Sequence, residues 1–187
     1  MKPRSFDPLK LDVGAFAREG ASLEGEWPAP SLPRLAEAAA PESDPAQWPP
    51  VRWSAQGEIR TPKGGEAQIW LALSAQAQVS LTCQRCLKPV REDLEVSRWF
   101  RFVRDEDQAA ELDMDSEDDV LSLPRHLDLR ELVEDELLLE LPVVPRHEEC
   151  PEPLPHANID EEEAPSQERP NPFAALAALK KGAGGKA

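Results

Sequence analysis

The stretch Gln68–Thr82, with the sequence QIWLALSAQAQVSLT, decides the fold of this chain. From Ile69 to Leu81 every second residue is apolar, and from Ser74 onward the positions between them are serine or glutamine. Successive side chains of a strand point to opposite faces, so this period of two predicts a long β-strand with one buried face. The other elements are placed outward from this strand.

The segment 83–89, with the sequence CQRCLKP, interrupts the alternation, which resumes over residues 90–103. Two alternating runs joined by a short polar segment are typical of a β-hairpin. Cys83 and Cys86 are therefore predicted at the tip of a hairpin. On the other side of the central strand, Val51–Arg60 also alternates, and residues 61–65 (TPKGG) supply a turn between the two strands.

Helices and two shorter strands complete the predicted domain. Each helix follows a residue whose side chain can accept hydrogen bonds from the free N–H groups of a first turn, namely Asp12, Ser31 or Asp128. The predicted helices are 13–19, ended by Gly20, then 32–39 and 129–140, and the predicted short strands are 23–27 and 120–123. The pattern predicts an α+β fold, an antiparallel β-sheet meander with helices packed on one face.

The composition divides the chain into one domain and two tail segments. Residues 1–150 are predicted to form a single α+β domain, with a linker at about 40–50 that holds four prolines and an acidic loop at about 105–119 that holds nine Asp or Glu residues. Residues 151–170 are acidic and proline-rich, which predicts a disordered tether. Residues 171–187 begin with Asn-Pro-Phe, and this predicts a short C-terminal helical motif.

Charge and cysteine content exclude several function classes. The 187 residues carry a net charge of −15, which disfavours broad, sequence-independent binding to nucleic acid. No segment has the length of apolar sequence that a membrane span needs, and the N-terminus has no signal-peptide pattern, so a cytoplasmic protein without a membrane partner is expected. The three cysteines do not indicate a disulfide framework. The absence of a recognisable nucleophile–base pair, phosphate loop or dinucleotide motif predicts a protein that is not an enzyme and has no small-molecule substrate.

Cys83, Cys86, His147 and Cys150 are the candidate metal ligands. The spacing C-x2-C allows two thiolates at a tight turn to approach one Zn²⁺, and the pair His-x2-Cys could supply the other half of a tetrahedral Cys3His site. Two alternatives stay open. The cysteines could have the purely structural role of shaping the hairpin. They could also form a redox pair activated by the neighbouring positive charge of Arg85 and Lys88.

A locally basic strip surrounds the same hairpin. Its candidate RNA-binding or partner-binding residues are Arg85, Lys88, Arg98, Arg101 and Arg104, interleaved with Trp99, Phe100 and Phe102. One interpretation is phosphate contacts beside a stacking aromatic side chain. The alternative, which the usual burial of aromatic residues favours, is a strand with alternating surface charges and core aromatics.

Two further sets of residues carry predictions. Phe173, Leu176 and Leu179 lie at helical spacing and predict a helix that docks in a groove of a partner protein. On the helix 129–140, Glu134 and Asp135 are expected in solvent, and Glu136 is expected to pair with an arginine of the sheet.

Three blocks of sequence resemble the YceD family. They are Leu81–Pro89 (LTCQRCLKP), Leu132–His147 (LVEDELLLELPVVPRH) and Asn171–Phe173 (NPF). The resemblance implies a non-enzymatic accessory factor in the synthesis, processing or stability of 23S ribosomal RNA, with rRNA or ribosome assembly and processing factors as partners. A protein–protein adaptor with a zinc-knuckle-like cysteine site, which does not contact RNA, is the alternative.

Overall fold

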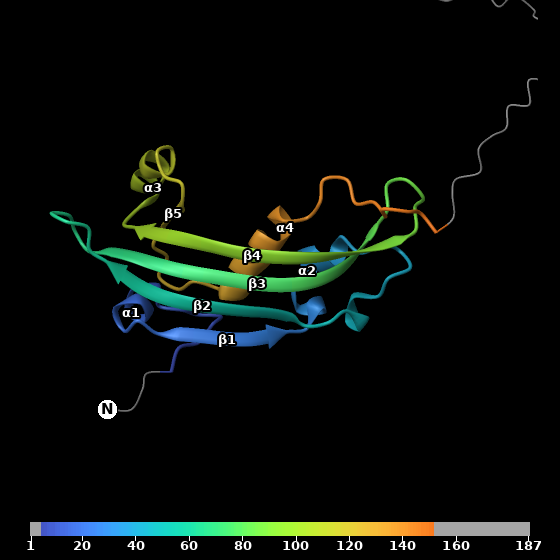
Figure 1. The fold of residues 1–187 in the computed structure, drawn as a ribbon. Helices are drawn as coiled ribbons and strands as arrows, with labels where there is room; N and C mark the ends of the chain where they lie inside the picture. The colour runs from blue at the N-terminus through green and yellow to red at the C-terminus, as the bar shows by residue number, and fades with distance from the viewer. Residues whose placement is uncertain (1–4, 152–187) are drawn as a thin grey trace, which may run out of the picture. The chain divides into compact units, whose positions relative to one another are not determined.

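The computed structural model describes residues 5–151. Within this range the chain forms a five-stranded sheet in the order β1-β2-β3-β4-β5 (Figure 1). The strands are β1 Ser22–Trp27, β2 Val51–Arg60, β3 Gln68–Thr82, β4 Pro89–Val103 and β5 Asp119–Ser122. Strands β1 to β4 pair antiparallel in sequence order, whereas β5 pairs with β4 in parallel. The α+β fold and the antiparallel meander are confirmed, and only the last strand runs in the other direction.

The described residues also form four helices: α1 Val13–Arg18, α2 Pro33–Glu37, α3 Glu106–Asp113 and α4 Leu129–Leu139. In Figure 1, α1, α2 and α4 lie on one side of the sheet, behind the strands. We call this side the core face and the opposite side the outer face. As predicted, Asp12 caps α1, because its Oδ1 accepts a hydrogen bond from Ala15 N at 2.9 Å. Gly20, with a φ of 57°, follows the end of this helix.

The hydrophobic core fills the space between the sheet and these three helices. Leu71 of β3, which lies between Gly57 of β2 and Phe100 of β4 in the register, is 0% exposed. α4 contributes the buried side chains predicted from its sequence, including Leu129, Val133 and Leu137. The predicted face of α4 is therefore the one that packs on the sheet.

α1 crosses β2 at a glycine. A Cβ atom built on Gly57 would lie 2.7 Å from Ala17 Cα and 2.7 Å from Phe16 Cδ1. Carbon atoms that are not bonded to each other pack at about 3.5–4.0 Å, so any larger residue at this position would push the helix away from the strand.

The start of α2 differs from the prediction. Ser31 does not cap this helix, because it lies in a 3-10 turn, Ala29–Ser31, and its hydroxyl donates to Pro28 O at 2.7 Å. The free N–H groups of Arg34 and Leu35 instead donate to Glu134 Oε1 of α4, at 2.7 and 3.2 Å. Glu134 was expected in solvent, but it is 5% exposed and acts as a distant cap for α2.

The predicted acidic loop at 105–119 is wrong, because α3 occupies most of it. Asp105 caps α3 by accepting a hydrogen bond from Gln108 N at 2.9 Å. Ala109 of α3 packs with Val103 and Val120 in a small second cluster. The register places Val103 and Val120 on the outer face, so α3 packs there, and the connection through α3 carries the chain back from the end of β4 to the level of Phe100, where β5 begins. This crossover makes β5 parallel to β4.

Two features complete the fold. β5 covers only Phe100–Val103 of β4, and the described residues place no strand beside the rest of this edge. No helix in the described range is both long and apolar enough to span a membrane. Apart from its first residue, Pro151, the predicted tether 151–170 lies outside the described residues, as does the predicted C-terminal helical motif 171–187.

Candidate metal centre

The turn between β3 and β4 directs two cysteine side chains inward. Cys83 N donates to Lys88 O at 2.9 Å and Leu87 N donates to Cys83 O at 2.9 Å, which closes the turn. Leu87 has a φ of 60°, the left-handed conformation that lets the chain reverse within so few residues. Cys83 is 0% exposed and Cys86 is 9% exposed, while Leu87 points into solvent.

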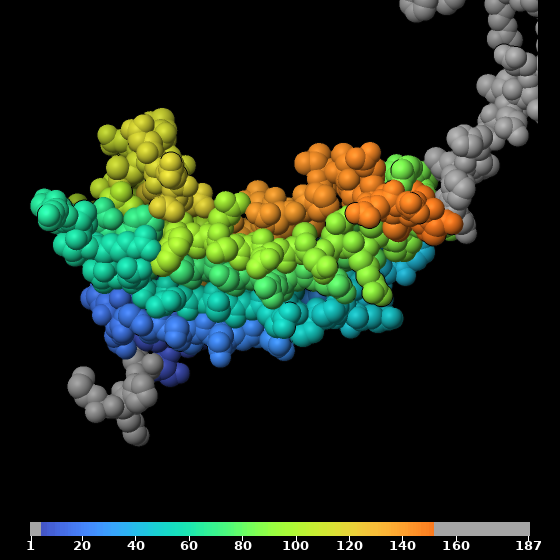
Figure 2. Space-filling view, viewed as in Figure 1, coloured from blue at the N-terminus to red at the C-terminus, as the bar shows by residue number. Residues whose placement is uncertain are grey.

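The segment after α4 brings the second pair of ligands to this turn. Pro145 O accepts a hydrogen bond from Gln84 N at 2.9 Å, which joins the two segments through their backbones. Figure 2 shows the segment after α4 (orange) beside the β3–β4 turn (light green). His147 and Cys150 lie on this segment and are partly buried.

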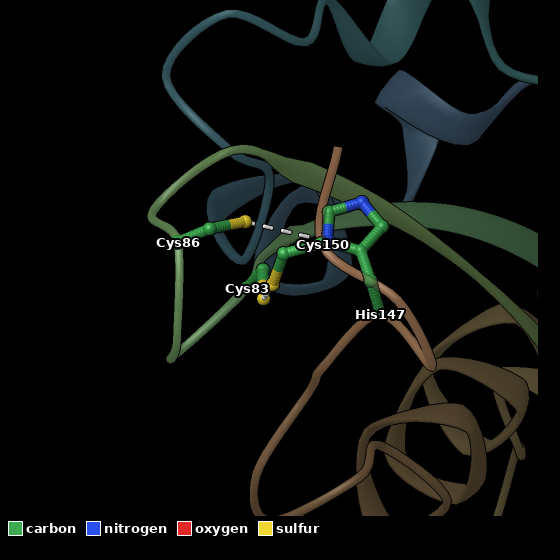
Figure 3. Close-up of side chains that lie close together, drawn as sticks. All are labelled: Cys83, Cys86, His147 and Cys150. Atoms are coloured by element: carbon green, nitrogen blue, oxygen red, sulfur yellow. Dashed lines mark hydrogen bonds between the residues drawn. The ribbon is translucent and has the colours of Figure 1, made fainter. Parts of the chain in front are cut away.

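The four predicted ligands converge on one point. Their Sγ and ring nitrogen atoms all lie within 4.8 Å of one another, and Figure 3 shows the side chains directed toward each other. Cys83 Sγ is 4.0 Å from Cys150 Sγ, and Cys86 Sγ is 3.4 Å from His147 Nδ1. In a tetrahedral zinc site with Zn–S bonds of about 2.3 Å and a Zn–N bond of about 2.0 Å, these distances would be about 3.8 Å and about 3.5 Å. The donor set therefore fits a tetrahedral metal ion.

The histidine is oriented by a second contact. His147 Nε2 lies 3.0 Å from Pro89 O, which can only accept a hydrogen bond. This contact favours the tautomer with the proton on Nε2, and it leaves the lone pair of Nδ1 directed at the cluster. Metal-binding histidines commonly have such a carbonyl partner.

Arg85 connects both halves of the cluster. Its Nε donates to Cys150 Sγ at 3.0 Å, and its terminal nitrogen donates to His147 O at 2.8 Å and to Glu148 O at 3.0 Å. The guanidinium therefore supplies positive charge beside the thiols and holds the backbone that carries the second ligand pair.

The local hydrogen bonds also set the ionisation of the cysteines. Burial raises the pKa of the Cys83 thiol, but backbone N–H groups, led by those of Cys86 and His147, offset this effect and lower its pKa to about 5. Burial, together with the neighbouring sulfur atoms of Cys150 and Cys83, raises the pKa of Cys86. As the pH rises, Cys83 therefore loses its proton before Cys86 does. A thiolate is the form that binds a cation, so Cys83 is the natural first ligand.

The family described as "Large ribosomal RNA subunit accumulation protein YceD" matches residues 71–180, which include all four cluster residues. The chain belongs to the YceD family. A relative of this name from Haemophilus influenzae is 31% identical over 180 residues, which cover 92% of this chain and 95% of the relative. No solved structure matches the chain.

In this YceD-family chain, the three cysteines of the described residues form no disulfide. Cys83 and Cys86 lie in a turn between two strands, whereas the low-pKa cysteine pair of thioredoxin-type proteins lies at the start of a helix. The local structure therefore offers the arrangement of a metal knuckle and lacks the helix of a redox motif.

The predicted basic strip is divided between different surfaces. Arg85 contacts the metal centre, and Lys88 is exposed beside it. Arg98 lies on the core face of β4, where it pairs with Glu136 at 3.6 Å and Glu140 at 3.0 Å, so the predicted pairing of Glu136 with a sheet arginine is confirmed. Arg101 lies on the outer face, and Arg104 is exposed after the end of β4. The structure does not bring these five residues together.

The aromatic residues of β4 are divided in the same way. Phe100 and Phe102 are buried in the core, as the alternative interpretation expects, while Trp99 is partly exposed on the outer face. There it meets Arg60 of β2, whose guanidinium carbon lies 3.9 Å from the ring centroid. Sequence analysis missed Arg60, although its alternation along β2 with core residues such as Val51 and Trp53 was enough to place it on the outer face.

Proposed function

We propose that this protein supports the accumulation of large-subunit ribosomal RNA, the 23S rRNA, as a non-enzymatic accessory factor in the cytoplasm. It would act in synthesis, processing or stability of the RNA, through rRNA itself or through assembly and processing factors. Membership of the YceD family and the name of the Haemophilus influenzae relative support this role.

The observation that carries the proposal beyond the family role is the convergence of Cys83, Cys86, His147 and Cys150. We propose that these residues hold one Zn²⁺ as a structural site. Four protein ligands fill a tetrahedral zinc ion and leave no position for water or substrate, which is the arrangement of structural rather than catalytic zinc. The ion would fasten the β3–β4 turn to the segment after α4 and give the protein a rigid binding surface at this end.

The test combines metal analysis with rRNA measurement in cells. Wild-type protein, Cys83→Ser, Cys150→Ser and the control Gln84→Ala, an exposed residue of the same turn, are purified and also returned to cells that lack the gene. We expect about one zinc per wild-type and control chain, and little zinc in either cysteine variant. The ratio of 23S to 16S rRNA should fall in cells without the gene and recover with wild type and Gln84→Ala.

Each part of the proposal has its own contradicting result. An unchanged 23S to 16S ratio in cells without the gene would remove the rRNA role. If wild-type protein purified from cells contained no metal and had an oxidised cysteine pair, this result would contradict the zinc site and indicate a redox pair. Full recovery of 23S rRNA by a zinc-free Cys83→Ser variant would show that zinc is not needed for the role.

A protein–protein adaptor is the second candidate. The net charge of −15 favours it. Arg85 and Arg98, two of the residues proposed for RNA binding, also already have contacts within the protein. The proposed docking residues of such an adaptor are Phe173, Leu176 and Leu179. Deleting residues 171–187 should then abolish capture of assembly or processing factors from cells, and that capture should resist salt. Direct RNA contact would instead leave Lys88, Arg101 and Arg104 as the proposed contacts, and it would weaken steeply with salt.

A further inference from the structure

The outer face of the sheet carries a cluster of arginine and tryptophan side chains at the end next to the turn 61–67. We call Arg60, Trp70, Trp99 and Arg101 the Arg–Trp cluster. In the register Trp70 lies opposite Arg101, and Trp99 lies opposite Ala72 on the same face. The guanidinium carbon of Arg60 is 4.4 Å from the Trp70 ring centroid and 3.9 Å from that of Trp99, and the two rings meet edge to face at 6.5 Å.

This cluster lies on the outer face, where α3 is the one helix of the described residues that packs, against Val103 and Val120. Figure 2 shows β1 to β4 forming an open surface that α1, α2 and α4 do not cover. Serine, glutamine and charged residues occupy most outward positions of β2 and β3, as water-facing strands normally do. Trp99 nevertheless exposes part of its ring there, and the Arg60 side chain is 35% exposed over it.

Arg101 has a donor that is not used within residues 5–151. Its Nε is buried and finds no hydrogen-bond acceptor among the described residues. Buried N–H groups of folded proteins are nearly always paired with protein or with ordered water. Beside Arg101 lies a hollow of about 480 Å³, whose lining includes Arg104, Gln68 and Gln108. Arginine and amide side chains around a hollow are suited to phosphate oxygens.

Acidic residues also lie near the cluster, and most of them already have partners within the protein. Arg60 is paired with Glu58 at 3.2 Å, and Glu66 lies on the rim of the hollow. At the start of α3, Asp105 and Glu106 already accept hydrogen bonds from Gln108 N and the Ser122 hydroxyl. The acidic residues Glu24, Glu26, Asp93 and Glu95 lie on the outer face further toward the other end of the sheet.

We propose that the Arg–Trp cluster binds a single-stranded segment of RNA. A base would stack on the exposed part of Trp99 and the guanidinium of Arg60, and a neighbouring phosphate would accept hydrogen bonds from Arg101 and Arg104. Flat aromatic and guanidinium groups on an open sheet bind unstacked bases, which double-stranded RNA does not offer. This inference rests on the proposed rRNA role, and it locates the RNA contact at the end of the sheet away from the metal centre.

The test measures binding of a fluorescent 12-nucleotide single-stranded RNA of mixed sequence to the full-length protein at several salt concentrations. Trp99→Ala should weaken binding by about tenfold or more, and Trp99→Phe should retain most of it, because one stacked base contributes a factor of this size. Arg101→Gln and Arg104→Gln should each weaken binding and reduce the slope of log affinity against log salt by about 0.7. Arg52→Gln is the matched control, since it removes the same charge from the outer face of β2 further along the sheet.

The outcomes separate this inference from the proposed function. Equal binding by wild type, Trp99→Ala and Arg104→Gln, or no binding by wild type, would overturn the inference, and circular dichroism of each variant checks that it is folded. Recovery of 23S rRNA by Trp99→Ala and Arg104→Gln to the wild-type level would also overturn it while the rRNA role remains. Capture of a protein, without crosslinked RNA, that is lost in the same variants would assign the surface to a protein partner instead.

Discussion

Arg85 donates a hydrogen bond from Nε to the Sγ of Cys150, 65 residues later in the chain, over 3.0 Å. Three thiolates and one Zn²⁺ would carry a net charge of −1, and the guanidinium places a compensating positive charge against one of the sulfurs. The same side chain also holds the carbonyl oxygens of His147 and Glu148. Arg85 thus fixes the second ligand pair even though it is not a ligand.

The first prediction concerns this arginine. Arg85→Gln should weaken zinc binding by about 10- to 100-fold, the usual effect of removing an outer contact of a metal site. Arg85→Lys should recover only part of the loss, because one ammonium cannot replace the fork that reaches a sulfur and two carbonyls. Competition with a chromophoric chelator measures the affinity. Arg91→Gln, an exposed arginine of β4, is the control, and an equal loss in that variant would contradict a specific role for Arg85.

The second prediction concerns the cap that α4 provides to α2. Glu134→Ala should lower the free energy of unfolding by about 2 kcal/mol, because the N–H groups of Arg34 and Leu35 lose their acceptor while the half-exposed Arg34 can be solvated. Asp135→Ala removes the neighbouring carboxylate, which pairs with Arg34 at the surface, and should cost less than about 1 kcal/mol. Urea unfolding measures both values. Similar losses in the two variants would contradict the capping role of Glu134.

The third prediction is a pH dependence from Glu136. Burial and the charge of Asp119 raise the pKa of this carboxyl above its ordinary value, although Arg98 opposes them. Over the range above about pH 4.5 the folded state therefore binds more protons at this site than the unfolded state, and this site lowers stability as the pH rises. The stability of Glu136→Gln relative to wild type should thus increase between about pH 4.5 and pH 7.

Urea unfolding at several pH values checks this dependence. Arg98→Gln should make the loss of stability with pH steeper, because it removes the charge that lowers the pKa of Glu136. A constant difference between wild type and Glu136→Gln over this range would contradict the raised pKa.

The fourth prediction concerns the contact of α1 with β2. Gly57→Ala should lower the free energy of unfolding by about 1–3 kcal/mol, because its methyl group would overlap the backbone of Ala17. Ser54→Ala, an exposed position on the outer face of the same strand, should change stability by less than about 0.5 kcal/mol. Thermal and urea unfolding measure both. A wild-type stability for Gly57→Ala would mean that α1 can move without cost.

Much of the sheet and of the metal centre follows from local sequence. The period of two in Gln68–Thr82 and in the strands beside it determines which side chains enter the core. The four ligand residues are also visible in sequence, because thiol and imidazole pairs at a spacing of three are unusual in a loop. Their approach across 60 residues depends on the length of α4 and on the hydrogen bond from Gln84 to Pro145, which sequence does not reveal.

The failures have specific physical causes. The density of carboxylates in 105–119 predicted a loop, but Glu106 and Asp107 fall in the first turn of α3, where negative charge stabilises a helix. The cap of α2 comes from Glu134, about 100 residues away, so no local pattern could indicate it. The basic strip was divided because Arg98 and Arg101 are separated by an odd number of positions along β4, which places them on opposite faces.

The partly uncovered edge of β4 has a consequence for the state of the protein in solution. Between Val90 and Trp99 no strand of the described residues pairs with this edge of β4, and such an edge can recruit a strand from another molecule. Arg91, Asp93 and Glu95 point to the outer face along this edge and Arg98 points to the core face, so an incoming strand would have to bring matching charges on both of its faces. The edge is thereby protected against self-association and fibril growth, while a partner with the complementary charge order could still add a strand to the sheet.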